Sequence, residues 1–265
     1  MRTRRRRLTP AYRLAVAICR PLLVVLTRRE WRGAENLPAD GGFVVAVNHL
    51  SYLDVFTAGH FLHDNGHTPH VLGKAEVFAV PVVGAIARAA EQIPVHRETG
   101  RAATAYRAVV EAVRAGWCVV IYPEGTLTRD PALWPMRGKT GAARVALETR
   151  CPVVPVAQWG VHEILPPYAV LPHLLPRRLV RVRAGAPVDL SDLYDRPLTT
   201  EVLVEATERV MRALTAELET IRGERAPVGT GFDPRVHGLP VTGKPSGRRR
   251  TAGVLAPPAV GEVRR

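Results

Sequence analysis

Cysteine is scarce in this sequence. Its 265 residues include three cysteines, Cys19, Cys118 and Cys151, and no two of them form a C-x-x-C pair. This number and spacing argue against a disulfide framework and against a structural zinc site. They are typical of a chain that works in a reducing compartment.

Long apolar runs are also missing. The best candidate, residues 11–26, is interrupted by Arg13, Arg20 and Pro21, so it lacks the ~20 uninterrupted apolar residues of a membrane-spanning helix. No small-x-small cleavage site follows it, which argues against a secretory signal peptide. With the arginines before it, the segment is instead typical of an amphipathic stretch at a membrane surface.

Serine is as rare as cysteine. Ser51, Ser191 and Ser246 are the only serines, and none stands in the G-x-S-x-G pattern of a serine hydrolase. Hydrophobic residues, in contrast, make up 46% of the chain. That fraction, at this length, predicts one globular domain with a sizeable core, flanked by tails.

The positive charge is concentrated at the two ends of the chain. The formal net charge is +13, of which residues 1–20 carry +7 and residues 223–265 carry +5. A nucleic-acid-binding fold would carry its basic residues on the folded domain, so we expect no nucleic acid partner. The ends are either solvated tails or segments attracted to an anionic membrane surface.

Strand-like and helix-like segments alternate between these ends. Near-continuous Val and Ile runs separated by helices predict an α/β fold, with a mostly parallel or mixed sheet covered on both faces by helices. Ligands of such sheets collect at the carboxyl ends of the strands. The predicted strands are 43–47, 70–74, 117–122, 152–157 and 179–185, and the predicted helices are 101–116, 141–150 and 201–222.

The stretch NHLSYLD, residues 48–54, follows the first predicted strand. Ser51 and Asp54 form the S-x-x-D pattern of a capping box, with Ser51 as N-cap and Asp54 in the first helical turn. From there the Asp54 carboxylate can reach back to His49, orient its ring and raise its basicity. The stretch alone fits a catalytic pair and a plain helix cap about equally well.

The stretch YPEGT, residues 122–126, follows the third predicted strand. Pro123 ends that strand, and Gly125 permits a tight turn with positive φ. Glu124 and Thr126 then project at the edge where ligands collect. On its own the stretch is better interpreted as an acidic turn.

Two basic residues are candidate phosphate ligands. Lys139 stands in GKTG, residues 138–141, just before a predicted helix, and a helix N-terminus favours anions. The stretch is not a P-loop, because Leu133 occupies the place of the first glycine. Arg97 is a candidate clamp for a phosphate, with a solvated surface arginine as the alternative.

Four histidines, at positions 60, 63, 67 and 70, have spacings of 3, 4 and 3 that could mimic a metal site. No second block of ligands with a recognisable spacing accompanies them. We interpret them as polar ends of an amphipathic helix and expect no metal and no cofactor.

These motifs, taken in order along residues 31–190, resemble the glycerolipid acyltransferases typified by 1-acylglycerol-3-phosphate acyltransferase. The family patterns are N-H-x-x-x-x-D, P-x-x-G followed by an arginine, P-E-G-T, a lysine–glycine pair and a Pro/Val-rich strand. Two departures are Tyr122, where the family often has Phe, and Leu127, where it often has Arg. The matching residues are Asn48, His49, Asp54; Pro81, Gly84, Arg97; Pro123 to Thr126; Lys139, Gly141; and Pro155.

The resemblance implies an O-acyltransferase of phospholipid biosynthesis. His49 would be the general base and Asp54 would orient it. The substrate-binding residues would be Asn48, Arg97, Glu124, Gly125, Thr126 and Lys139. The expected partners are acyl-CoA or acyl-carrier protein, a lysophospholipid acceptor and an anionic membrane surface, which implies a peripheral or monotopic protein on the cytoplasmic face of the membrane.

Composition and charge at the two ends, together with the resemblance between them, divide the chain into three parts. Residues 1–30 are expected to form a basic, apolar membrane-surface segment, residues 31–222 the acyltransferase domain, and residues 223–265 a disordered Pro/Gly/Arg-rich tail. Two alternatives remain, namely an acyltransferase for another lysolipid or glycolipid, and a non-catalytic lipid-binding homologue.

Overall fold

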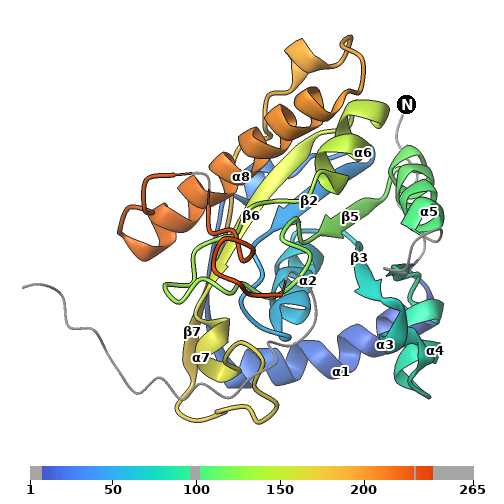
Figure 1. The fold of residues 1–265 in the computed structure, drawn as a ribbon. Coiled ribbons are helices and arrows are strands. Elements are labelled where there is room, and N and C mark those ends of the chain that lie inside the picture. The colour runs from blue at the N-terminus through green and yellow to red at the C-terminus, as the bar shows by residue number, and fades with distance from the viewer. Residues whose placement is uncertain (1–7, 96–101, 230, 241–265) are drawn as a thin grey trace, which may run out of the picture.

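The central feature of the molecule is a seven-stranded sheet (Figure 1). The structure is a computed structural model that describes residues 8–95, 102–229 and 231–240. The strand order is β1–β7–β6–β2–β5–β3–β4, and only the β6–β7 pair is antiparallel. The strands are β1 (Thr27–Arg32), β2 (Phe43–Val47), β3 (Pro69–Lys74), β4 (Ile93–Val95), β5 (Cys118–Ile121), β6 (Val153–Trp159) and β7 (Arg178–Ala184). The predicted α/β fold with a mostly parallel or mixed sheet is confirmed.

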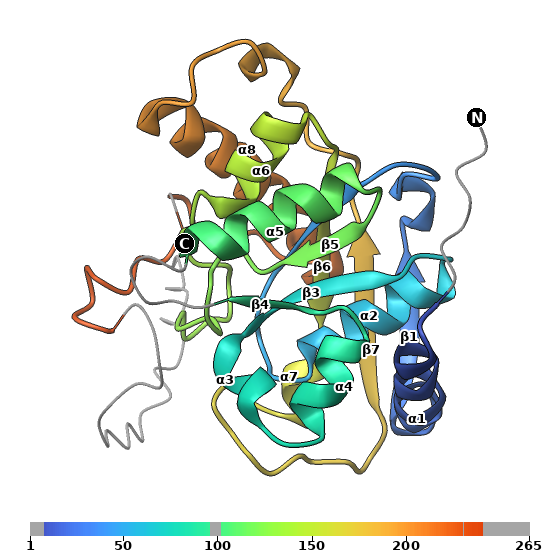
Figure 2. The same ribbon diagram turned by 90° about the vertical axis from the view of Figure 1, so that its right-hand side faces the viewer.

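Helices cover both faces of this sheet (Figure 2). Helices α5, α6 and α8 pack on one face, and α2 and α7 pack on the other. The helices are α1 (Pro10–Leu26), α2 (Asp54–Asp64), α3 (Ala75–Ala79), α4 (Val83–Ala89), α5 (Ala102–Arg114), α6 (Gly141–Thr149), α7 (Val161–Ile164) and α8 (Thr200–Arg222), with short 3-10 turns η1 (Ala34–Asn36) and η2 (Ser191–Leu193).

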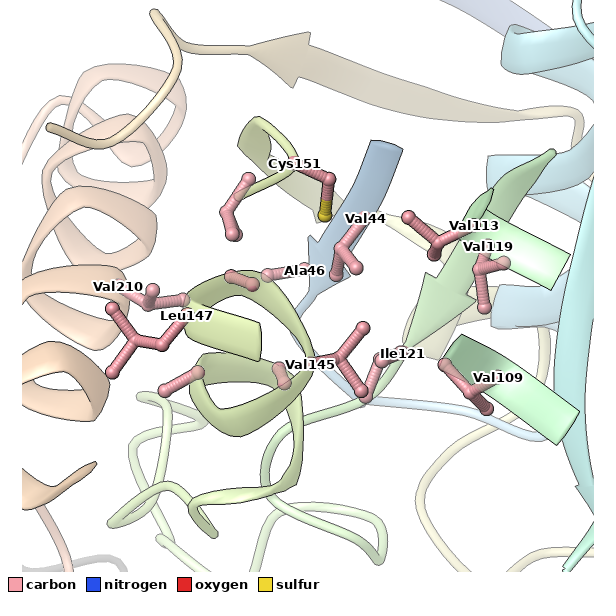
Figure 3. Close-up of a cluster of buried hydrophobic side chains, with 14 of the residues drawn as sticks. Val44, Ala46, Val109, Val113, Val119, Ile121, Val145, Leu147, Cys151 and Val210 are labelled. Carbon is pink, nitrogen blue, oxygen red and sulfur yellow. The ribbon is translucent and has the colours of Figure 1, made fainter. Parts of the chain in front are cut away.

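The core follows from the alternation of side chains along each strand. In β2, Val44 and Ala46 point into the cluster with α5, α6 and α8 (Figure 3). Val45 and Val47 point to the other face, toward α2. Because β2 is buried on both faces, its sequence is a continuous apolar run, which made this strand easy to predict.

The five predicted strands and three predicted helices all occur within one or two residues of their expected bounds. Two strands were not expected. β1 is an edge strand with the polar sequence TRREWR, and β4 has three residues with Pro94 in the middle. Short or polar edge strands give little hydrophobic signal, since one side of each is unpaired.

Helix α1 lies on the α2 side of the sheet, against α2, α4 and β1. Tyr12 is its buried anchor. Leu14, Ile18, Leu22 and Val25, spaced as neighbours on one helix face, are 53–65% exposed. Within the described residues, no helix combines the length and the apolar character needed to cross a bilayer.

Part of the expected tail lies against the domain. After α8, Phe232 forms a single parallel bridge with Met136, and its carbonyl accepts the N–H of Arg137 at 3.1 Å. Pro234 is buried. Residues 231–240 therefore have defined contacts, in contrast to the expectation of a disordered segment from residue 223 onward.

Candidate active site

The candidate site lies at the carboxyl ends of β2 and β5. These strands are parallel neighbours, with Ala46 opposite Ile121, so the segments that follow them start side by side. The segment after β2 carries His49, and the segment after β5 carries Glu124. The structure thus brings together two motifs that lie 75 residues apart in the sequence.

His49 and Asp54 form a hydrogen-bonded pair. Nδ1 of His49 lies 2.9 Å from Oδ2 of Asp54; the Asp54 side chain is fully buried, whereas that of His49 is 17% exposed. A carboxylate accepts a hydrogen bond, so Nδ1 carries the proton and Nε2 is the basic nitrogen. The geometry is that of a histidine oriented for general-base chemistry.

Asp54 also fixes the backbone around His49. Its Oδ2 accepts the N–H groups of Leu50 at 2.5 Å and Ser51 at 2.8 Å. Burial raises the pKa of the Asp54 carboxyl above its ordinary value, although the hydrogen bonds from His49, Ser51 and Leu50 act in the opposite sense. The loop is therefore built around this one oxygen.

The expected capping box is present only in part. Helix α2 begins at Asp54 with Leu53 as N-cap, so Ser51 lies before the cap. Asp54 accepts the Ser51 N–H as the pattern predicts, but Ser51 Oγ accepts the N–H of Leu53, at 3.1 Å, in place of that of Asp54. The Asp54 N–H instead donates to the Ser51 backbone carbonyl at 3.2 Å.

Glu124 ties two loops together. Its Oε1 accepts the backbone N–H of His49 and its Oε2 that of Met136, each at 2.9 Å. The side chain is 2% exposed. Burial raises the pKa of Glu124 to about 8, so the carboxyl is largely neutral at pH 7. The contacts give Glu124 the role of shaping the turn.

Gly125 and Lys139 come together over this turn. Gly125 has φ +70°, which confirms the predicted positive φ. A Cβ at Gly125 would lie 2.6 Å from Nζ of Lys139, so the lysine side chain crosses directly over the glycine. The Lys139 N–H also donates to the Pro123 carbonyl at 2.9 Å. Thr126, the last residue of this motif, is buried.

A cavity of about 370 Å³ opens beside Glu124 and Lys139. Helix α8 and the segment after it form the opposite wall, with apolar groups from Met211 and charged groups from Arg235. Its remaining lining residues are Met136, Arg137, Gly138, Thr140, Val204, Thr207, Glu208, Asp233 and Pro234. The lining carries three basic side chains, Arg137, Lys139 and Arg235, together with the acidic Glu208 and Asp233, and Arg137 lies 3.9 Å from Asp233.

Two predicted substrate-binding residues stand differently. Asn48 is fully buried, its Nδ2 donates to the Gln158 carbonyl at 3.0 Å, and its Oδ1 accepts the Gln158 N–H at 2.8 Å. Its amide is thus used within the protein, in contrast to the expected contact with substrate. Arg97 lies outside the described residues.

The four spaced histidines point to separate partners. His60 contacts Trp31 edge-on, and the rings of the other three contact three different aromatic side chains. Those pairs are His63 with Tyr12, His67 with Phe43, and His70 with Trp117. Among residues 8–95, 102–229 and 231–240, no group of three or more His, Cys, Asp or Glu side chains is placed to hold a metal ion.

Two residues near the pair, Gln158 and Thr57, were not singled out from the sequence, and Tyr122 was noted only as part of a motif and as a departure from the family pattern. Gln158 and Thr57 form a buried side-chain hydrogen bond of 2.6 Å, and the Tyr122 ring lies 4.2 Å from the His49 ring between centroids. One signal was available. Gln158 interrupts the otherwise apolar strand VVPVAQW, and a buried amide in such a strand must have hydrogen-bond partners.

Comparison with known proteins agrees with the motifs. Residues 28–159 match the family model described as Acyltransferase. The chain is 34% identical over 141 residues to a chloroplastic 1-acyl-sn-glycerol-3-phosphate acyltransferase of Brassica napus, an alignment that covers 52% of this chain and 39% of the relative. It is 32% identical over 126 residues to the Bacillus subtilis 1-acyl-sn-glycerol-3-phosphate acyltransferase, covering 48% of this chain and 60% of the relative.

A solved structure supports the fold. The 1-acyl-sn-glycerophosphate acyltransferase of Thermotoga maritima superimposes with a TM-score of 0.60 at 22% identity, covering 82% of this chain and 81% of the other. The alignments with the two curated relatives span less than two thirds of either relative. The matched segment, residues 28–159, nevertheless contains His49 in direct contact with both Asp54 and Glu124 at one strand edge, and this segment belongs to the Acyltransferase family.

Proposed function

We propose that this protein transfers a fatty acyl group from a thioester donor to the free hydroxyl of a lysophospholipid. The preferred acceptor is 1-acylglycerol 3-phosphate, which would become phosphatidate, and the donor is acyl-CoA or acyl-carrier protein. The observation that carries the proposal is the 2.9 Å contact between a buried Asp54 and a partly exposed His49. The relatives named above supply the substrate class.

The proposed reaction needs one base and no covalent enzyme intermediate. His49 Nε2 takes the proton of the acceptor hydroxyl, and the hydroxyl oxygen attacks the thioester carbonyl carbon. The tetrahedral intermediate collapses with cleavage of the carbon–sulfur bond. The imidazolium returns its proton to the departing thiolate, so that the ester and the free thiol are the products. Asp54 stabilises the imidazolium between these two proton transfers.

The cavity beside Lys139 is the proposed place for the acceptor phosphate. Lys139, Arg137 and Arg235 line it, and helix α6 begins two residues after Lys139. Cations and a helix N-terminus both favour a phosphate. Because the Glu124 carboxyl has a pKa raised to about 8, it adds little repulsion at pH 7. Arg97 is proposed as a further ligand of this phosphate.

An acceptor panel tests the reaction. Purified protein is incubated with acyl-CoA or acyl-carrier protein and with lysophosphatidate, glycerol 3-phosphate or other lysolipids, and thiol release and lipid products are measured. We expect phosphatidate from lysophosphatidate, with His49→Ala as the inactive control. A preference for another lysolipid would correct the acceptor. No transfer to any acceptor, with lipid binding retained, would support the non-catalytic alternative.

The proposed place of action is an anionic membrane surface on its cytoplasmic side. Figures 1 and 2 show α1, α4 and the loop between α7 and β7 along one side of the molecule. This side carries exposed apolar residues, such as Ile18 of α1 at 53%, Val83 of α4 at 51% and Leu171 of the loop at 78%. Apolar burial together with the arginines at the chain start favours a lipid surface.

Vesicle sedimentation tests the membrane assignment. Removing residues 1–26, or changing Leu14 and Ile18 to Glu, should release much of the protein from anionic vesicles, and high salt should add to the release. Leu198→Glu is the matched control, because Leu198 is also exposed but belongs to the segment between η2 and α8. That segment leads into α8 at the end of the molecule opposite α1 (Figure 1). Equal sedimentation of all variants would exclude α1 from membrane binding.

A further inference from the structure

Gln158 is a polar residue in the middle of the core. It lies near the carboxyl end of β6 between Ala157 and Trp159, and none of its surface is exposed. An uncharged amide buried in this way costs free energy unless its donors and acceptors are paired. The partners of Gln158 are therefore the place to look for its role.

The first partner is the segment that carries the base. Gln158 and Asn48 exchange two hydrogen bonds between the Asn48 side chain and the Gln158 backbone, of 2.8 and 3.0 Å. The Gln158 side chain adds a third, from Nε2 to the Asn48 carbonyl at 3.3 Å. Asn48 directly precedes His49, so these bonds fix the point from which the base projects.

The second partner is the helix that carries the carboxylate. Thr57 Oγ1 donates to Gln158 Oε1 at 2.6 Å, and it also lies 3.2 Å from the Asp54 carbonyl. Thr57 is three residues after Asp54 on α2, within one helical turn. The nitrogen of the Gln158 amide thus bonds the segment that contains His49, and the oxygen of the amide bonds helix α2, which begins with Asp54.

We propose that Gln158 is a positioning residue that sets the separation of His49 and Asp54, which belong to different elements. The effect of Gln158 on rate depends on the proposed acyltransfer. Its effect on the geometry of the pair does not depend on that function. The two side chains of the pair meet through one 2.9 Å contact. A shift of about 1 Å between reacting groups can cost about 10²-fold in rate.

Tyr122 adds a second contact to the same unit. Its ring lies against the His49 ring with an interplanar angle of 30°. Its buried hydroxyl has no hydrogen-bond partner in the part of the chain that the structure describes, although the nearby Gln158 amide acts to lower the pKa of Tyr122. Burial, the larger effect, raises the pKa of Tyr122 well above its ordinary value. The Tyr122 ring therefore packs against the imidazole ring, while the Gln158 side chain bonds the Asn48 carbonyl and the Thr57 hydroxyl.

The test uses Thr57→Val, which keeps the shape of the side chain and removes its hydrogen bond to Gln158. We expect kcat to fall about 10- to 10²-fold with little change in the acceptor KM, and the pH profile of kcat/KM to shift, because only the orientation of the base changes. Thr57→Ser should restore most of the activity. Thr149→Val is the matched control, since Thr149 Oγ1 donates to the Val145 carbonyl at 2.7 Å within α6, in another part of the fold.

Two further measurements separate positioning from general damage. In a His49→Ala background, Thr57→Val should cause no additional loss, because its effect passes through the pair. NMR of ¹⁵N-histidine in the full chain should show a changed His49 Nδ1–H resonance in Thr57→Val and not in Thr149→Val. An unchanged resonance and pH profile in Thr57→Val would overturn the proposal. A wild-type protein without acyltransfer would overturn the proposed function but leave the NMR result to be decided separately.

Discussion

The two sides of the site are built differently. On the His49 side, Asp54, Glu124 and Asn48 are buried, and each of these side chains makes short hydrogen bonds. On the Lys139 side, Lys139 and Arg137 are exposed at the rim of a cavity. Buried, satisfied groups resist movement, whereas exposed long side chains adapt. The first side is suited to chemistry that needs fixed geometry, and the second to binding a charged group.

The largest expected effect tests the His49 side. His49→Ala should lower kcat by about 10² to 10⁴-fold with little change in acceptor KM, as for a lost general base. The measurement is steady-state kinetics with saturating donor. Circular dichroism and thermal unfolding should match the wild type, because the imidazole is partly exposed and its backbone N–H stays bonded to Glu124. Near-normal kcat in this variant would contradict the mechanism.

The next effect separates charge from shape at Asp54. Asp54→Asn keeps the volume of the side chain but replaces one carboxylate oxygen by an NH₂ group, which donates hydrogen bonds and cannot accept them. The donors around Asp54, from His49, Leu50 and Ser51, then have one acceptor fewer. We expect kcat to fall about 10- to 10²-fold, less than in His49→Ala, because a misoriented imidazole is still present. A loss larger than that of His49→Ala would mean that Asp54 acts mainly by stabilising the fold. Urea unfolding measures that contribution, because three hydrogen bonds to Oδ2 would be weakened in the variant.

A smaller effect concerns stability and pH at Glu124. The folded state keeps the Glu124 proton up to about pH 8, whereas the unfolded state loses it near its ordinary value of 4.5. Between these values the unfolded state binds fewer protons, so the free energy of unfolding should fall as pH rises. Glu124→Gln cannot titrate and should flatten this dependence, and losing one acceptor should cost about 1–3 kcal/mol.

Urea unfolding at pH 5, 6, 7 and 8 measures the difference between wild type and Glu124→Gln. Glu35→Gln is the control, because Glu35 is exposed on η1 and its surroundings change little on unfolding. Parallel pH dependence in wild type and Glu124→Gln would mean that Glu124 is ionised in the folded protein at neutral pH.

The smallest effect belongs to the exposed side. Lys139→Ala or Arg235→Ala should raise the KM for a phosphate-bearing acceptor about 3- to 10-fold, the magnitude of a solvent-screened ion pair, with kcat nearly unchanged. Arg212→Ala, on the outer surface of α8, is the control. A large fall in kcat for Lys139→Ala would mean that Lys139 takes part in the chemical step, and the division of the site into a catalytic side and a binding side would be wrong.

Much of the fold could be predicted because its central strands are buried on both faces. A run such as FVVAV, residues 43–47, gives the same signal in any parallel sheet, and the Gly125 turn follows from local backbone sterics. The edge strand β1 escaped prediction because a half-solvated strand tolerates TRREWR. Local sequence patterns therefore predict single strands or helices and the turns that follow them.

The connections within the site could not be predicted in the same way. That His49 and Asp54 meet follows from a five-residue spacing and a helix start. That Glu124 bridges His49 and Met136, or that Gln158 bridges Asn48 and Thr57, depends on which strands are neighbours and on their register. The sequence contained the residues, but the pairing of β2 with β5 and β6 supplies the contacts.

Helix α1 continues into the sheet without a linker. Leu26 ends the helix and Thr27 begins β1, which pairs with β7 over six residues, while the Arg177 side chain donates to the carbonyls of Val24 and Thr27 at 2.8 Å. A helix joined in this way cannot swivel. If α1 rests on a lipid surface, the whole sheet has one fixed orientation relative to that surface. The depth to which a lysolipid must rise to meet His49 is then a fixed dimension of the protein and not an average over a moving tether.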